Sequence, residues 1–234
     1  MSTVIERHHL AEVKVPGKPL GRHVAHDPRS KNYDAANLLP PNAQIFTKEH
    51  ACLAPIYNQG DTGSCTGNAE AGVLMCEPFH QEGWAFTEDD ARKFYSEATH
   101  LDRLKGVWPP DDTGSNGLAV MKAAQKAGYI TAYAHVFTFD VLCKYLSNIG
   151  PVINGTVWKQ GMDHPDHSGV VRVVGNIRGG HEWVIRGIDV ERQLIGPCRN
   201  SWGPTYGLHG EFYVPFPDYI ELMKEQGDIT VPII

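Results

Sequence analysis

The chain has 234 residues, of which 41% are hydrophobic and 21% are charged, and its formal net charge is −6. These values are ordinary for a globular protein, and the length allows a sizeable core. The acidic balance and the lack of any Lys/Arg-rich run argue against nucleic acid as a partner. No stretch approaches the ~20 apolar residues of a membrane span.

The N-terminal residues and the cysteines indicate in which cellular compartment the protein is expected. Residues 1–18 lack the apolar core of a secretory signal peptide, so we expect a cytoplasmic protein. The chain has five cysteines, an odd number, and no pair is spaced as CxxC. We therefore expect most of them to be reduced thiols, buried as small apolar residues.

Residues 1–42 are polar, contain several prolines and show little periodicity. They predict an extended N-terminal arm that packs along a folded domain formed by residues 43–234. Two alternatives stay open. The arm crosses a cleft of that domain as a built-in inhibitory segment, or it docks the protein into a larger assembly.

A stretch of glycines and small polar residues places Gln59 six residues before Cys65. An apolar run follows and predicts a helix over residues 65–77, which should end at Pro78. A thiol at a helix N-terminus meets unpaired backbone N–H groups and the helix dipole, which favour a thiolate. Gln59 and the nearby backbone N–H groups could form an oxyanion site beside it.

The next segments predict two helices joined by a loop. Residues 87–90 have the pattern of an N-cap followed by an acidic first turn, and a helix should continue to about residue 98. Residues 105–117 form a loop rich in Gly, Pro and Asp. A further helix is expected from Leu118 to about Lys126, and it should stop at Gly128.

From residue 150 the pattern changes to extended structure. After a short amphipathic helix over 139–146, strands are expected over 150–157, 170–174, 182–188, 193–197 and 211–214. This half contains Gly180-His181 before an apolar strand and, further on, Asn200-Ser201-Trp202-Gly203.

The order of these motifs resembles that of the papain-like cysteine proteases. That family has an N-Q-G-x-x-G-S-C segment, a late Gly-His before an apolar strand, and an N-S-W-G segment; residues 58–65, 180–181 and 200–203 match them in turn. The resemblance covers roughly residues 52–216. It implies a two-lobed α+β fold, with a helical lobe over about 43–150, a β-rich lobe over about 151–234, and the active-site cleft between them.

The resemblance also implies roles for single residues. Cys65 would be the nucleophile, His181 the base and Asn200 the residue that orients the imidazole, with Cys65 and His181 resting as thiolate and imidazolium. Gln59 would donate to the oxyanion. The residues implied to contact substrate are Gly63, Ser64, Ser115, Asn116, Gly117, Gly180 and Trp202; of these, residues 115–117 fit an ordinary N-capping turn equally well, and Trp202 would also shield the His–Asn bond.

Several positions depart from the family pattern. Thr62 stands where a disulfide-bonded cysteine is common, and Thr66 where a tryptophan is common. Glu182 follows His181, where a small apolar residue is usual. Inside the cleft it would stabilise an imidazolium, but strand alternation directs it away from His181, and we expect a solvated side chain. The interval from Cys65 to His181 is shorter than the family's ~130–150 residues, which indicates a compact bacterial or phage-type member.

These features predict a cysteine endopeptidase that acts on peptide or protein substrates through a thioester acyl-enzyme, without a cofactor. The segment 163–167 contains two His and two Asp around a proline, and we expect a solvated turn there and no metal site. Two other functions use the same residues: an amidase or acyltransferase, such as a cell-wall peptide hydrolase, and a structural component, for example of a phage virion, built on a protease fold.

Overall fold

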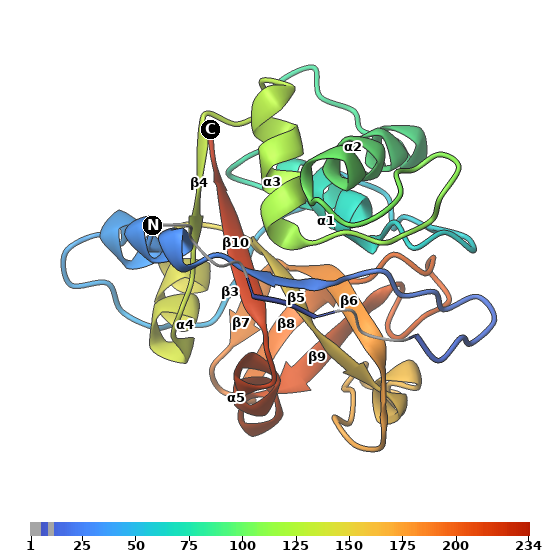
Figure 1. Ribbon diagram of the computed structural model, residues 1–234. Coiled ribbons are helices and arrows are strands. Elements are labelled where there is room, and N and C mark those ends of the chain that lie inside the picture. Colours follow the sequence, from blue (N-terminus) through green and yellow to red (C-terminus); the bar gives the residue numbers. More distant parts are fainter. Residues whose placement is uncertain (1–5, 9–11) are drawn as a thin grey trace.

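The computed structural model describes residues 6–8 and 12–234 (Figure 1). Residues 1–5 and 9–11 of the predicted arm lie outside the described residues. The fold is α+β: three helices pack together on one side of an antiparallel sheet, and the chain's first part runs between these two layers (Figure 1).

The helical layer consists of α1 (Cys65–Leu74), α2 (Glu88–Leu101) and α3 (Gly117–Lys126). At the start of α2, the side chains of Thr87 and Asp90 bond reciprocally to backbone N–H groups in a capping box. Gly67 lets α1 approach α2 closely, because a Cβ there would lie 2.7 Å from the Tyr95 nitrogen. α1 ends at Leu74, three residues before the end that the sequence predicts.

Eight strands form the sheet. Its order is β3 (Lys48–Glu49), β7 (Gly187–Asp189), β8 (Leu194–Arg199), β6 (Ile177–Ile185), β5 (Val152–Lys159), β10 (Asp228–Ile233) and β4 (Ala132–His135), with β9 (Glu211–Pro215) paired to β8. β3 and β4 come from residues that the sequence-based division assigns to the helical lobe. The predicted strand over 170–174 does not form: Val170 makes only an isolated bridge with Tyr213.

The remaining elements lie around the sheet. α4 (Phe139–Asn148) covers the predicted amphipathic helix, whereas α5 (Phe216–Lys224) has no counterpart in the sequence-based expectation. The described residues also form short 3₁₀ helices: η1 (Pro28–Asn32), η2 (Ala35–Leu38) and η3 (Gln160–Asp163). Within the part of the chain that the structure describes, no helix is long and apolar enough to cross a membrane.

The arm is fastened to the domain by backbone hydrogen bonds. β1 (Glu6–His8) pairs antiparallel with β2 (Val24–His26), so the arm doubles back on itself. Between these strands it follows the start of β6, where the Val13 N–H donates to the Arg178 carbonyl over 2.6 Å. This bond holds the arm at Val13 against β6.

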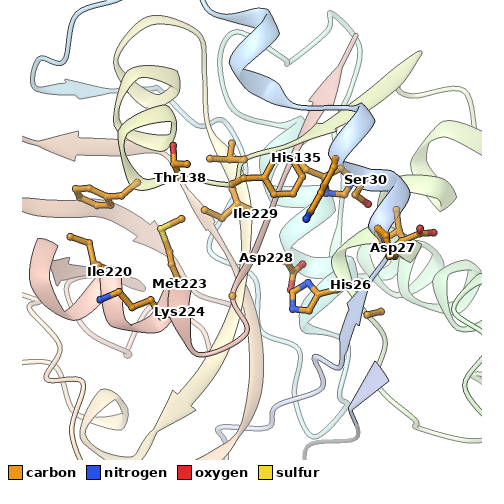
Figure 2. Close-up of a pocket in the computed structure, with 18 residues that line it drawn as sticks. His26, Asp27, Ser30, His135, Thr138, Ile220, Met223, Lys224, Asp228 and Ile229 are labelled. Carbon is orange, nitrogen blue, oxygen red and sulfur yellow. The ribbon is translucent and has the colours of Figure 1, made fainter. Parts of the chain in front are cut away.

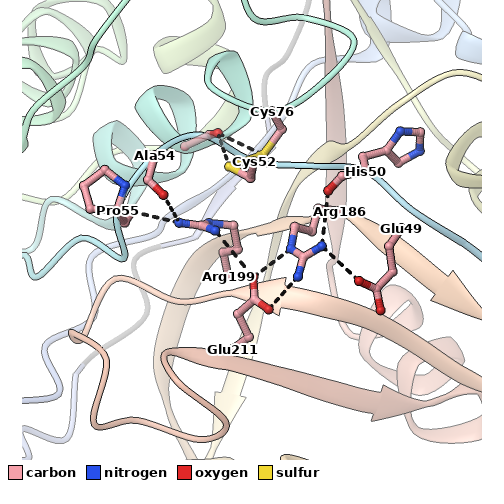
Figure 3. A network of polar contacts seen from close by, with 10 residues as sticks. Glu49, His50, Cys52, Ala54, Pro55, Cys76, Arg186, Arg199 and Glu211 are labelled. Carbon is pink, nitrogen blue, oxygen red and sulfur yellow. Dashed lines mark hydrogen bonds and ion pairs between the residues drawn. A yellow bond between two sulfur atoms is a disulfide. The ribbon is translucent and has the colours of Figure 1, made fainter.

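An ion-pair network fastens the segment that leads into residues 58–65 (Figure 3). Glu211 accepts two hydrogen bonds of 2.7 Å from the Arg186 guanidinium. Arg199 donates to the carbonyl oxygens of Ala54 and Pro55, both over 2.8 Å, and also contacts Glu211. These bonds join residues 54–55 to β8 and β9, and thus to the sheet that carries His181.

A disulfide closes the same region. Cys52 and Cys76 are bonded, and Cys65, Cys143 and Cys198 are free and buried. The bond links the segment before residues 58–65 to the turn after α1 (Figure 3). Both ends of the stretch that contains Gln59 and Cys65 are therefore held.

We predict that Glu211→Gln lowers the free energy of unfolding by at least ~2 kcal/mol. It leaves the Arg199 guanidinium without a carboxylate and Arg186 with only the exposed carboxylate of Glu49. The side chains of Arg186 and Arg199 are 15% and 11% exposed. Urea unfolding measures the change.

The matched control is Glu221→Gln. Glu221 pairs with Lys224 on α5, with side chains 59% and 65% exposed, and its loss should cost at most ~0.5 kcal/mol. Equal effects of the two substitutions would contradict the role given to Glu211.

Candidate active site

Cys65 is the first residue of α1, and its side chain is buried. Burial raises the pKa of the thiol far above its ordinary value, and the Glu182 carboxylate acts in the same direction. The backbone N–H groups of Glu182 and Thr66 bond to the sulfur and oppose this rise. The thiol lies beside β6, next to the residue that follows His181, and is protonated in this closed form.

His181 on β6 is bonded to Asn200, the residue that follows β8. The distance from His181 Nε2 to Asn200 Oδ1 is 2.7 Å. Asn200 Oδ1 also accepts from the Ser201 backbone N–H over 2.8 Å, which fixes the amide with its oxygen toward the ring. His181 Nε2 must then carry the hydrogen, and the buried Nδ1, which has no hydrogen-bond partner among the described residues, is left as the basic nitrogen.

Two tryptophans enclose this histidine. The Trp202 ring stacks on His181, with centroids 4.8 Å apart and an interplanar angle of 29°. Trp158 on β5 meets the same imidazole edge to face at 5.0 Å and also touches Trp202. The rings exclude water from the His181–Asn200 bond and hold the imidazole in one orientation.

The surroundings favour an uncharged imidazole. Burial lowers the pKa of His181 to about 3, although the bond to Asn200 acts to raise it. Together with the raised thiol pKa, this makes the neutral pair the stable form here, in place of the thiolate and imidazolium that the family resemblance implies. The cause is desolvation of both groups.

Gln59 is held between two neighbours. Its Nε2 donates to the Thr62 carbonyl over 2.7 Å, and its Oε1 accepts from the Ser201 hydroxyl. An amide nitrogen has two N–H groups, so one donor remains beyond the bond to Thr62. The backbone N–H of Gln59 also donates to the Ser201 carbonyl, which links the segment 58–65 to the residue after Asn200.

The arm crosses directly beside these residues. The N–H groups of Gly21 and Arg22 both donate to the carbonyl oxygen of Gly180, over 3.1 and 3.0 Å. On the other side, Ser115 N–H donates to the Gly21 carbonyl over 2.8 Å and Ser115 O accepts from the His23 N–H over 2.7 Å. The arm thus forms a bridge between the loop before α3 and the residue before His181.

Gly21 fits this path because it has no side chain. A Cβ there would collide with the carbonyl of Gly63, and a Cβ at Gly114 would collide with the Gly21 carbonyl. Trp202 Nε1 donates to the Pro19 carbonyl over 3.0 Å. A cavity of about 1010 Å³ remains beside the arm, with Gly63, Gly114 and Gly180 in its lining. The arm therefore occupies part of a groove between the helical layer and the sheet.

The other predicted contact residues have structural bonds of their own. Ser64 is buried, and its hydroxyl accepts from Asn68 Nδ2 over 3.1 Å. Asn116 is the N-cap of α3, and its side chain accepts from the Ala119 N–H over 3.0 Å. Ser115 Oγ donates to Asp102 over 2.7 Å. The 115–117 turn is thus both an N-cap, through Asn116, and a strip of backbone that pairs with the arm, through Ser115.

The expectation of a solvated Glu182 is wrong. Its side chain is 1% exposed, because the face of β6 opposite His181 is covered as well. Burial, with the neighbouring carboxylates of Asp228 and Glu70, raises the pKa of Glu182, while Arg22 opposes the rise.

The segment 163–167 contains a local turn. Asp166 accepts from the N–H groups of Ser168 and Val170 and from the Ser168 hydroxyl. The described residues contain no group of three or more His, Cys, Asp or Glu side chains placed to hold a metal ion.

Sequence reasoning missed three contributors to the site. Trp158 has no flanking motif. Asp112 accepts from the Gly63 N–H over 2.8 Å and from the Tyr95 hydroxyl over 2.6 Å, which fixes the segment 58–65 against α2. The third contributor is the pair Gly21-Arg22 in the arm. In the sequence, only the glycine after Pro19 and Leu20 could have indicated that the arm approaches the site closely.

Among known proteins, solved structures resemble this chain in their architecture. No protein-family model matches the chain, and a search of curated proteins found no significant match. Among solved structures, the chain is similar over 100% of both chains to xylellain, a cysteine protease from Xylella fastidiosa, with a TM-score of 0.65 and 16% identity. It is also similar to two digestive procathepsins from the Tenebrio molitor larval midgut.

The match to procathepsin L 3 has a TM-score of 0.58 and 13% identity and covers 88% of this chain and 77% of the other. The match to procathepsin L2 has a TM-score of 0.53 and 15% identity and covers 82% and 70%. The chain therefore has the papain-like cysteine protease fold.

Proposed function

We propose that this chain is a cysteine peptidase that cleaves peptide bonds with Cys65, His181 and Asn200, and that its arm holds the active site closed. The observation that carries the proposal is the His181–Asn200 bond, which leaves Nδ1 as the basic nitrogen. The next residue on β6, Glu182, donates its backbone N–H to the Cys65 thiol at the N-terminus of α1. The fold shared with xylellain, a cysteine protease by its description, supports the same reading.

Each of these residues has a separate role in the proposed reaction. His181 Nδ1 takes the proton of Cys65, and the thiolate attacks the substrate carbonyl carbon. The Cys65 backbone N–H and the remaining Gln59 N–H stabilise the oxyanion. The imidazolium then gives its proton to the leaving amine, and a thioester is formed. Water, activated by the same imidazole, hydrolyses the thioester and restores the thiol.

Closure by the arm follows from its contacts. The backbone of Gly21 and Arg22 uses hydrogen-bonding groups at Ser115 and Gly180 that a bound peptide would need. Both Cys65 and His181 are buried under this arrangement. A substrate must displace the arm before its carbonyl can reach the thiol.

We predict that Gly21→Ala speeds the labelling of Cys65 by an epoxide thiol-protease probe at least ~10-fold, because the new methyl group collides with the Gly63 carbonyl and lifts the arm. Peptide mass spectrometry of the full chain locates and quantifies the adduct.

Val13→Ala is the matched control, since this side chain of the arm is 53% exposed and its backbone bond to Arg178 is kept. Its labelling rate should equal that of the unmodified chain. If Gly21→Ala labels no faster than Val13→Ala, the arm does not close the site.

We predict that, in the Gly21→Ala chain, Cys65→Ala or His181→Ala abolishes cleavage of a synthetic peptide mixture. Gln59→Ala should lower kcat/KM by ~10²–10³ through the loss of one oxyanion donor. Mass spectrometry of the products measures the rates.

Cys143→Ala, which removes another buried free thiol, should leave the rates unchanged within about two-fold. Undiminished cleavage by the Cys65→Ala chain would refute the proposed nucleophile.

We predict that the burial of Cys65 determines how the rate of its alkylation depends on pH. Because the folded pKa of Cys65 is raised, the unmodified chain contains little thiolate at pH 7, and its reaction with iodoacetamide should stay slow from pH 5 to 8 and climb only above that range. In the Gly21→Ala chain, solvent reaches the pair and the rate at pH 7 should exceed this by ~10-fold or more. A fast, pH-independent reaction of the unmodified chain from pH 5 to 8 would mean that a resting ion pair is already exposed.

A further inference from the structure

One side chain of the arm lies buried among acidic groups beside the proposed active site. Arg22 is 1% exposed, and its Nη2 donates to the Asp228 carboxylate and, over 2.6 Å, to the Gln226 carbonyl. A guanidinium stays charged in proteins, so its burial requires such partners. The partners belong to the start of β10 and the residues just before it.

A second carboxylate faces the same space. Both oxygens of Glu182 are buried and have no hydrogen-bond partner among the described residues. Arg22 Nε and Glu182 Oε2 lie 2.7 and 3.0 Å from the point where a side chain of Gly155 would begin. Glu182 therefore lines the wall of the pocket that Arg22 fills, with hydrogen-bonding capacity that the arginine has not used.

Two glycines provide the space for the Arg22 side chain. A Cβ at Gly155 would meet the Arg22 and Glu182 atoms just named, and a Cβ at Gly117 would lie 2.5 Å from Glu182 Oε1 and 2.9 Å from Asp228 Oδ2. The pocket is therefore defined by Gly117, Gly155, Glu182 and Asp228, and any larger residue at either glycine would narrow it.

Asp228 also lines a second cavity, which is open to solvent. This cavity of about 980 Å³ lies between the arm, β4, α5 and β10, and Figure 2 shows Asp228 beside His26 at its wall. The Asp228 side chain is 19% exposed, whereas that of Arg22 is fully buried. The Asp228 carboxylate is therefore partly hydrated, while that of Glu182 lies deeper and is dehydrated.

The pocket adjoins the proposed catalytic residues. The backbone N–H of Glu182 bonds to the Cys65 sulfur, and the backbone of Arg22 bonds to Gly180, which precedes His181. A peptide backbone that pairs with Ser115 and Gly180, as residues 21–23 of the arm do, places one side chain in this pocket.

We propose that the pocket of Gly117, Gly155, Glu182 and Asp228 selects an arginine side chain of the peptide substrate, and that Arg22 fills it as an internal substitute. The inference rests on the proposed peptidase function. A neutral side chain in this pocket would leave the partly buried carboxylate of Asp228 without a cation, which is costly. Lysine supplies the charge but not the planar fork of donors, so it is the weaker ligand.

The first test measures binding without catalysis. In the full chain with Arg22→Ala, ethylguanidine supplies the atoms that the substitution removes, and ethylurea is its neutral counterpart. Ethylguanidine should raise the thermal unfolding midpoint of this variant by about 4 °C or more at saturation, and ethylurea should not. The unmodified chain, and the Arg22→Ala chain that also carries Asp228→Asn, should show no specific rise.

The second test measures substrate choice and does not need the Arg22→Ala chain to fold. The Gly21→Ala chain is given a peptide library in which each position near the cleaved bond is varied. Arginine should be required at one fixed position, with citrulline, its neutral isostere, about 100-fold poorer in kcat/KM. Asp228→Asn should bring arginine and citrulline within a few-fold of each other, and Glu221→Gln, on the exposed face of α5, should leave the preference intact.

The outcomes separate the two proposals. Cleavage or probe labelling at Cys65 without a preference for arginine overturns the pocket and leaves the peptidase standing. Rescue by ethylguanidine in a chain that cleaves nothing supports the pocket and refutes the peptidase. A folded Arg22→Ala chain that does not respond to ethylguanidine also overturns the inference.

Discussion

The backbone of residues 21–23 joins the two halves of the molecule, and the state of the site depends on it. Its bonds to Ser115 on one side and to Gly180 on the other occupy the groove between the helical layer and the sheet. Cys65 and His181 are buried beside this passage, and Arg22 lies near the carboxyl groups of Asp228 and Glu182. The desolvated thiol and imidazole and the acidic pocket therefore all lie along one crossing of the arm.

Under the proposed peptidase function, this arrangement stores Cys65 and His181 in an unreactive form. A thiolate and an imidazolium are stabilised by hydration or by their mutual electrostatic attraction. Burial beside the arm removes the hydration and disfavours both charges. Asn200, Ser201 and the two tryptophans nevertheless hold His181 in one tautomer and orientation. Opening the groove changes the solvation of the pair and leaves its supports in place.

Local motifs predicted the parts of the site that depend on local geometry. Cys65 lies at a helix N-terminus because small polar residues and an apolar run define that boundary within a few positions. The burial of Glu182 could not be predicted, because it depends on Arg22 and Asp228, which lie 160 and 46 positions away in sequence and meet it only in the fold. β10 was missed since Pro232 interrupts its pattern, and that strand brings Asp228 to the pocket.

The most direct test of the account is a crystal structure of the full chain after reaction with an epoxide inhibitor that carries an arginine side chain. The account predicts a covalent bond to Cys65 Sγ, the inhibitor's guanidinium at Asp228 in the place of Arg22, and residues 19–23 displaced from Ser115 and Gly180. An adduct on Cys65 with the arm still in its groove, or a guanidinium elsewhere with Arg22 in place, would contradict it.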